Sequence, residues 1–289
     1  TSDFAYHALY QISPGAAQFF MPVQKSDEDN GIRMEVVSAY LHGNTAEIYI
    51  AMQDLTGERI DRSTDLYDSY SINRAFDSSA SCRLVEYDEA TKTATFLIVI
   101  KEQGSGNMEG DKITFSVREF LSHKNYYENV EIPVELPSFT AGSRTQTVAP
   151  TGVYSEKSGA GSKTYWNETS TDTLVPGQPM KEFPVDGIDL TGIGYIDGRL
   201  HVQTAVPNRL ENDNHGFFYL KDAEGNDVNE SYGLYFISSG ESGRVDYHES
   251  VFDIPAEEIA AYKLYGNFVT AGMRTEGNWR VTFQLEREK

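Results

Sequence analysis

The sequence predicts an all-β protein built from two tandem β-sandwich domains. It contains 18 Tyr, 15 Phe, 24 Gly and 10 Pro, a composition typical of short strands joined by tight turns. The alternating apolar stretch around Tyr40 and Gly43 recurs around Tyr195 and Gly198, which indicates an internal duplication. A chain of 289 residues has room for two such domains, each with its own hydrophobic core.

Residues 1–30 are expected to form a helical lead-in to the first domain. Apolar residues between Phe4 and Phe20 are spaced to share one face of a helix. Ser13-Pro14 adds a capping residue followed by proline at the first helical position. A short N-terminal helix is therefore predicted here.

An acidic turn precedes the first predicted hairpin. Asp27, Asp29 and Gly31 have the spacing at which a calcium-binding loop begins, but no bidentate acid follows at the expected later position. A solvated turn is favoured over a calcium site.

The first domain is expected to span residues 31–140. Side chains alternate with a period of two from Met34 to Leu41 and again from Ala46 to Met52, which predicts a β-hairpin. Asp54 then opens a second turn, in which its side chain accepts hydrogen bonds from its own backbone. Further strands are predicted at residues 82–87, 93–100, 113–117 and 130–136.

Residues 141–172 are interpreted as a linker or as a strand exchanged between the domains. Gly, Ser, Thr and Pro dominate much of this stretch, and its apolar density is low. Tyr165 and Trp166 stand out near its end.

The second domain is expected to span residues 173–289. Asp197-Gly198 lies between alternating apolar residues and is the strongest hairpin signal in the chain. Proline and early acids within residues 253–262 predict a short interstrand helix. A strand at residues 279–285 is expected to close this domain, as residues 131–136 close the first. The resulting fold class is two tandem immunoglobulin-like β-sandwich domains with short N-terminal and interstrand helices.

The charge balance argues against nucleic acid as a partner. The formal net charge is −20, with 24 Lys and Arg against 44 Asp and Glu, whereas phosphate binding needs a basic surface.

No apolar run is long enough to cross a bilayer. The sequence begins at Thr1 rather than at methionine, which leads us to expect an upstream signal or anchor.

Reactive residues form no recognisable catalytic or metal-binding motif. The single cysteine, Cys82, excludes a disulfide framework, and the six histidines show no metal-ligand spacing. We expect no catalysis, no cofactor and no metal site. Carboxylate pairs for glycoside cleavage are recognised by their separation in space, so the sequence neither supports nor excludes them.

Aromatic residues supply the remaining candidates for ligand binding. Tyr165 and Trp166, together with Trp279, could stack on a sugar. The alternative interpretation of Tyr165 and Trp166 is a pair that seals the contact between the domains.

The N-terminal third to half of the chain carries a set of turns and apolar positions: Ser13-Pro14, Ala17-Gln18, Pro22-Val23, Asp29, Gly31-Ile32, Gly43, Ile48 to Ile50 and residues 54–57. In these positions it resembles an uncharacterised family of extracellular domains of Gram-positive membrane proteins. In that family the domain typically follows a transmembrane helix, and some members look like anti-sigma factors.

This resemblance implies an extracellular, membrane-anchored sensing or binding region, whose partner would be a protein or a cell-wall ligand. The alternatives are a carbohydrate-binding module or glycan-active enzyme, and a structural spacer with no ligand.

Overall fold

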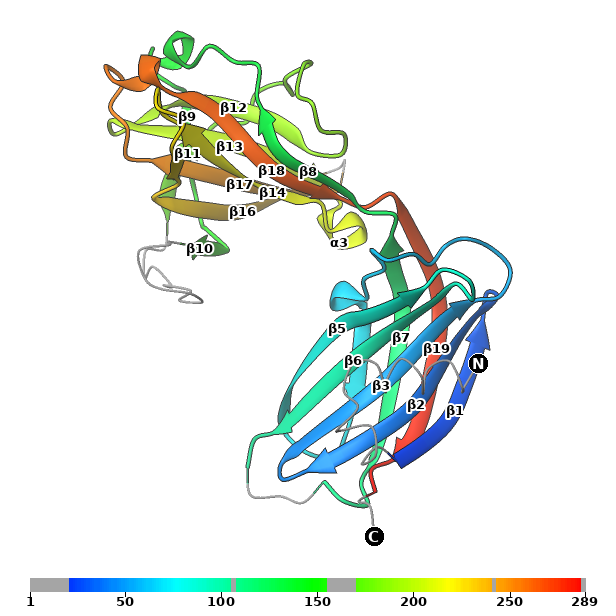
Figure 1. Cartoon of the computed structure of the whole chain (residues 1–289). Helices are drawn as coiled ribbons and strands as arrows, with labels where there is room; N and C mark the ends of the chain where they lie inside the picture. The colour runs from blue at the N-terminus through cyan, green and yellow to red at the C-terminus, as the bar shows by residue number, and fades with distance from the viewer. Residues whose placement is uncertain (1–20, 105–107, 155–169, 241–242, 287–289) are drawn as a thin grey trace. The chain divides into compact units, whose positions relative to one another are not determined.

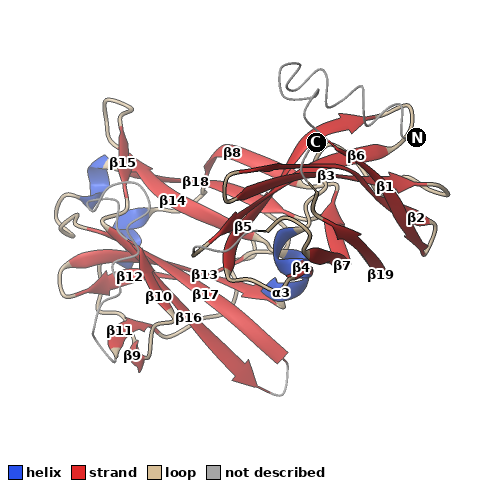
Figure 2. Cartoon of the chain, turned by 90° about the horizontal axis from the view of Figure 1, so that it is seen from below, coloured by secondary structure: helices blue, strands red, loops and turns tan. Residues whose placement is uncertain are grey.

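Almost all regular structure in the described residues is β-strand. The computed structural model describes residues 21–104, 108–154, 170–240 and 243–286 (Figures 1 and 2). The all-β prediction is confirmed. The helix predicted between residues 4 and 20 lies outside the described residues. Within the described part of the chain, no helix has the length and apolar character needed to cross a membrane.

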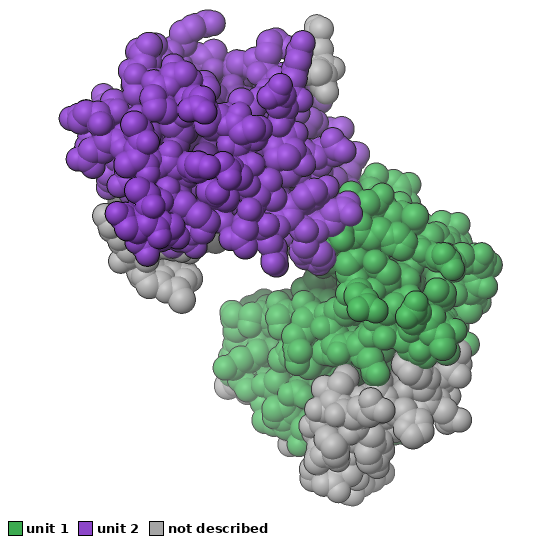
Figure 3. Space-filling view, turned by 45° about the horizontal axis from the view of Figure 1, so that its top comes forward, with its two compact units in different colours: residues 1–124, 271–289 green, residues 125–270 purple. Residues whose placement is uncertain are grey.

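The chain divides into two compact units (Figure 3). Each unit is built from antiparallel sheets, as in a sandwich. Unit 1 comprises residues 1–124 and 271–289, and unit 2 comprises residues 125–270. Unit 2 is thus inserted into the sequence of unit 1, instead of following it in tandem.

Unit 1 contains a five-stranded and a three-stranded sheet. The first has the order β1 (Met21–Asp29), β2 (Ile32–His42), β3 (Thr45–Asp54), β6 (Thr93–Glu102) and β5 (Ser78–Asp88). The second has the order β19 (Met273–Gln284), β7 (Lys112–Ser122) and β4 (Tyr70–Asn73), which follows the 3₁₀ turn η1 (Tyr67–Ser69). Apolar side chains from both sheets form one core, including Phe96 of β6, Phe115 of β7 and Trp279 of β19.

The predicted hairpin at residues 34–52 is confirmed, with one departure from regular alternation. β2 and β3 pair in antiparallel fashion, but a register shift lies between Val36 and Ser38. Because a bulge adds one residue to a strand, it exchanges the faces of the residues that follow. Val36 and Ala39 consequently share the main core, while Val37 packs in a separate cluster with Tyr49.

Unit 2 contains a five-stranded sheet, a four-stranded sheet and a two-stranded ribbon. The five-stranded sheet has the order β10 (Gly152–Tyr154), β16 (Tyr232–Gly240), β17 (Gly243–Phe252), β13 (Arg199–Pro207) and β12 (Asp189–Ile196). The four-stranded sheet has the order β15 (Asp227–Asn229), β14 (His215–Lys221), β18 (Lys263–Thr270) and β8 (Asn125–Glu131). β11 (Thr171–Leu174) and β9 (Thr145–Val148) form the ribbon. The short helical segments are η2 (Leu136–Phe139), α3 (Arg209–Asn212) and η4 (Ile259–Ala261).

Local turn signals in unit 2 are confirmed. Asp197 and Gly198 join β12 to β13 with φ angles of 48° and 78°, as a tight hairpin turn requires. The helix predicted within residues 253–262 is present as the 3₁₀ turn η4.

The predicted boundaries, 1–30, 31–140, 141–172 and 173–289, differ from the observed division. Residues 21–29, predicted as part of a helical lead-in, form strand β1, which pairs with β2. A strand at residues 130–136 was expected to close the first domain. The structure instead has β8 at Asn125–Glu131, followed by the 3₁₀ turn η2 at Leu136–Phe139, and β8 pairs with β18 of unit 2. β19, which was expected to close the second domain, pairs with β7 of unit 1 from Met273–Ser122 to Gln284–Lys112. Within residues 141–172, predicted as a linker or an exchanged strand, β9 and β10 are strands of unit 2. The prediction failed because strand patterns show that a strand exists but do not specify its distant partner.

Candidate functional site

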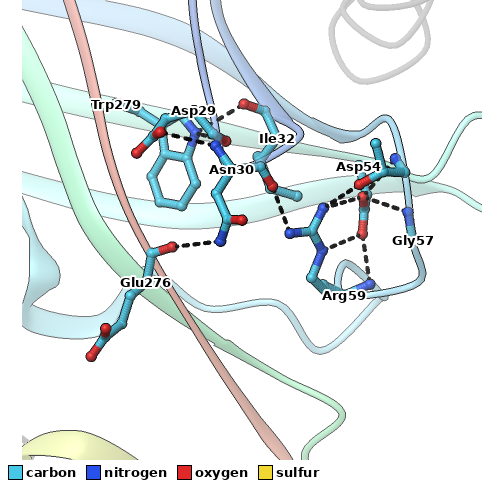
Figure 4. A network of polar contacts seen from close by, with 9 residues as sticks. Asp29, Asn30, Ile32, Asp54, Gly57, Arg59, Glu276 and Trp279 are labelled. Carbon is cyan, nitrogen blue, oxygen red and sulfur yellow. Dashed lines mark hydrogen bonds and ion pairs between the residues drawn. The ribbon is translucent and has the colours of Figure 1, made fainter.

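The three aromatic residues predicted to bind a ligand do not form a site. Tyr165 and Trp166 lie outside the described residues. Trp279 is 0% exposed, and its indole Nε1 donates hydrogen bonds to the backbone oxygens of Asp29 and Ile32 at 3.1 and 2.9 Å (Figure 4). The prediction for Trp279 is therefore wrong, since a buried ring of the unit 1 core offers no face to a ligand.

The acidic turn has a structural use. At the edge of β1, Asp27 accepts a hydrogen bond from the backbone N–H of Arg280 at 2.8 Å, and Asp29 accepts one from Asn278 at 2.7 Å. Lys25 donates to the Thr282 carbonyl at 3.3 Å. Side chains at every second position of β1 thus bond the edge of β19 as a neighbouring strand would.

These bonds account for the carboxylates that suggested calcium. Among the described residues, no group of three or more His, Cys, Asp or Glu side chains could hold a metal ion.

A cleft of about 860 Å³ in unit 2 is the strongest candidate for a functional site. Its wall contains residues from the four-stranded sheet, such as Phe217 of β14, and from the five-stranded sheet, such as Tyr235 of β16 and Tyr247 of β17. Small-molecule sites typically have volumes of about 300–1,000 Å³ and apolar, aromatic walls with a few polar groups. The size and lining of this cleft match that description.

Stacked rings form much of the cleft wall. Phe236 and Tyr247 stack with their ring centroids 4.8 Å apart and their planes 6° apart. Tyr235 stacks on His248 at 4.4 Å, and Phe217 meets the same imidazole edge-on at 6.0 Å. Phe217 is nevertheless 47% exposed, so part of its ring is available to another molecule. These stacks fix the ring orientations before any ligand arrives.

Two arginines line the cleft, and their environments differ. Arg244 forms a two-pronged ion pair with Asp246, with N–O distances of 2.6 and 2.7 Å. Arg209, in α3, is half-buried and lines both this cleft and an adjoining cavity of about 30 Å³. Within the described ranges, its guanidinium makes no hydrogen bond or ion pair.

A buried acid, Glu230, also lines the cleft, and a buried imidazole, His248, lines the adjoining cavity. Glu230 Oε2 lies 3.9 Å from His248 Nε2, and the two residues are 7% and 8% exposed. Burial, with a smaller contribution from the positive charge of Arg209, lowers the pKa of His248 to about 4. His248 is therefore neutral at pH 7, and its contact with Glu230 is not an ion pair. Gly233 permits this arrangement, because a Cβ there would lie 2.7 Å from His248 Nε2.

A second buried polar cluster in unit 2 serves to attach the β9–β11 ribbon. Glu249 of β17 is 0% exposed, contacts His201 Nδ1 at 2.6 Å and accepts a hydrogen bond from the backbone N–H of Leu174 at 3.1 Å. Gln203 donates to the Leu174 carbonyl and to Glu249, both at 2.8 Å. Each of these partners satisfies another buried polar group, so the cluster stabilises the fold and does not resemble an open site.

Sequence reasoning missed the cleft entirely. Its aromatic residues are distributed over β14, β16 and β17, where each is indistinguishable from an ordinary strand residue. The one available signal was the dense aromatic run Phe217-Phe218-Tyr219, which contains more ring surface than a single buried face of a strand needs.

Comparisons with known proteins add no functional assignment. No family model and no curated protein matches the chain. A solved structure described as the conserved domain protein from Bacillus anthracis aligns with 95% of this chain and 94% of its own, at 12% identity and a TM-score of 0.32.

Proposed function

We propose that this chain is a binding or sensing region without catalytic activity, and that its ligand occupies the cleft of unit 2. The observation that carries the proposal is the aromatic cleft of about 860 Å³, which combines oriented rings with a small number of polar groups. Neither a cofactor nor a nucleic acid is part of the proposal, in keeping with the net charge of −20.

The resemblance of the N-terminal part supports a more specific setting for this activity. We propose that the chain forms the extracellular, membrane-anchored part of a bacterial protein, acting as an anti-sigma-factor-like regulator. Its two units would be immunoglobulin-like sandwiches, and a cell-wall ligand or a protein would be the partner. Protease treatment of intact cells tests the location, because an extracellular region is cleaved without lysis.

Thermal unfolding with a panel of sugars, cell-wall fragments and divalent cations tests the binding proposal. A ligand that binds only the folded state adds about 2.7 kcal/mol at 100 times its Kd, enough to raise Tm by several degrees. Phe217→Ser in the cleft should abolish that increase. Leu55→Ser, at a comparably exposed apolar residue of unit 1 (44% against 47% exposed), should not. A ligand effect that survives Phe217→Ser, or no effect from any compound, would contradict the proposal.

Glycan binding or cleavage is the second candidate function. Two acids, Glu230 and Asp246, line the cleft together with the aromatic rings. Both oxygens of Asp246 are already bonded by Arg244. This supports sugar binding more than sugar hydrolysis. Release of reducing ends from cell-wall polysaccharide, lost in Glu230→Gln, would instead establish an enzyme.

A further inference from the structure

The Arg209 guanidinium gives the cleft a positive charge that its neighbours do not neutralise. α3 places this side chain directly after β13, between Asn208 and Asp213, which both have left-handed backbone with φ of 50° and 48°. Arg209 lines the main cleft and also the smaller cavity beside His248. Its position is therefore set by a short, defined turn at the margin of the aromatic wall.

The other charged groups of the cleft do not offset Arg209 by direct contact. Asp246 is held by Arg244, and the carboxylate of Glu230 lies against the His248 ring. Among described residues, none of the acids comes within ion-pairing distance of Arg209. In a chain with a net charge of −20, an arginine that lines a cavity without forming an ion pair is unusual.

The walls beside Arg209 suit a flat apolar group. Phe217 and Tyr235 line both cavities that Arg209 lines, and the Phe236–Tyr247 stack lies along the same cleft. Planar rings are favourable partners for such surfaces, because offset or edge-to-face contacts between rings add to the burial of apolar area.

We propose that the cleft of unit 2 binds a ring-bearing anion, its flat body against Phe217 and Tyr235 and its carboxylate, sulfonate or phosphate on Arg209. A guanidinium presents two parallel N–H donors that match the oxygens of such groups. This inference rests on the proposed binding function and specifies the ligand class of the same site.

Two matched probes test the inference on the full chain. 8-Anilinonaphthalene-1-sulfonate carries the anion, and N-phenyl-1-naphthylamine has the same aromatic body without it. Calorimetric titration should give saturable one-to-one binding of both. Arg209→Gln should weaken the sulfonate about 10- to 100-fold and leave the uncharged probe unchanged, as expected for loss of hydrogen bonds to a charged group. Arg209→Lys should restore part of the sulfonate affinity, and added salt should weaken only the sulfonate.

Each part of the inference can fail separately. If Arg209→Gln affects both probes equally, or neither, the assignment of Arg209 as the anion receptor is wrong while the cleft remains a binding site. If decanoate displaces the sulfonate more strongly than 1-naphthoate does, the ring preference is wrong. If neither probe binds saturably, the inferred ligand class is wrong. If Phe217→Ser weakens the binding of neither probe more than the control Leu55→Ser does, the probes do not bind in the cleft and the assigned site is wrong. The proposed binding function fails separately, by the thermal unfolding test described above.

Discussion

Replacing Asp54 by asparagine should lower the free energy of unfolding of unit 1 by about 2–3 kcal/mol at pH 7. The Asp54 side chain is 0% exposed. It accepts backbone hydrogen bonds from Thr56, Gly57 and Arg59 at 3.1, 2.9 and 2.8 Å. The Arg59 guanidinium adds bonds at 2.7 and 3.1 Å and also donates to the Asn30 carbonyl at 2.7 Å (Figure 4). Asp54→Asn would place an amide N–H₂ against these donors.

The magnitude comes from the pKa of this carboxyl. Burial raises the pKa of Asp54, but the Arg59 guanidinium and the backbone N–H groups outweigh burial and lower the pKa from 3.8 to about 2. At about 1.36 kcal/mol per pKa unit, this difference corresponds to about 2.4 kcal/mol in favour of the folded state. Since the folded-state pKa is the lower one, this stabilisation is complete above about pH 5 and is lost as the pH falls from 3.8 towards 2.

Tryptophan fluorescence reports the unfolding of unit 1 if Trp166 is replaced by Phe. Trp279 then remains as the single tryptophan, buried in the unit 1 core with its ring centroid 5.8 Å from that of Phe120. Urea titrations at about pH 7 and about pH 2.5 should show a large effect of Asp54→Asn only at the higher pH. A decrease of about 2–3 kcal/mol should lower Tm by roughly 5–10 °C.

The matched control is Glu58→Gln in the same loop. It removes the same charge from a side chain that is 83% exposed and lies 3.7 Å from Lys92. Surface ion pairs of this kind contribute about 0–1 kcal/mol, so Glu58→Gln should change little. The reasoning would be refuted if Asp54→Asn changed the free energy of unfolding by less than about 1 kcal/mol, or equally at both pH values.

Three further outcomes are expected. Glu249→Gln should cost unit 2 about 2–4 kcal/mol in urea titrations followed by circular dichroism, because it puts an amide in place of a buried carboxyl group that contacts His201 at 2.6 Å. A loss below about 1 kcal/mol would contradict this role. Gly198→Ala should cost about 1–2 kcal/mol of stability, because the φ angle of Gly198 is 78°. The control Gly240→Ala should be nearly neutral, because Gly240 has no positive φ and nothing lies within 4 Å of the added Cβ. Equal melting points for the two variants would refute the strain argument. Burial, together with the negative charge of Asp65, raises the pKa of Cys82 from 9.0 to about 12. Iodoacetamide at about pH 8 should therefore label the thiol of the native protein about a thousandfold more slowly than that of the urea-unfolded protein. Similar labelling rates would contradict the burial of Cys82.

Local patterns in the sequence were sufficient to predict the class of the protein and several of its turns. The hairpin β2–β3 could be predicted from side chains that alternate with a period of two. The hairpin β12–β13 could be predicted from its Asp197-Gly198 turn. Both signals depend only on residues that are neighbours in the sequence. The Asp54 turn belongs to the same category, since its acceptors and donors lie within five residues of one another. In each case the residues that form the structure are close together in the chain.

The pairing of distant strands and the position of the ligand cleft became visible in the folded chain alone. β19 carries the alternation of any half-buried strand, and nothing near it in sequence indicates that β7 is its partner. Trp279 could be taken for a binding residue until that pairing buried it in unit 1. The cleft likewise gathers Arg209, Phe217 and Tyr235 from separate elements of unit 2. Such features arise from contacts between distant segments, because a strand presents the same pattern whichever neighbour completes its hydrogen bonds.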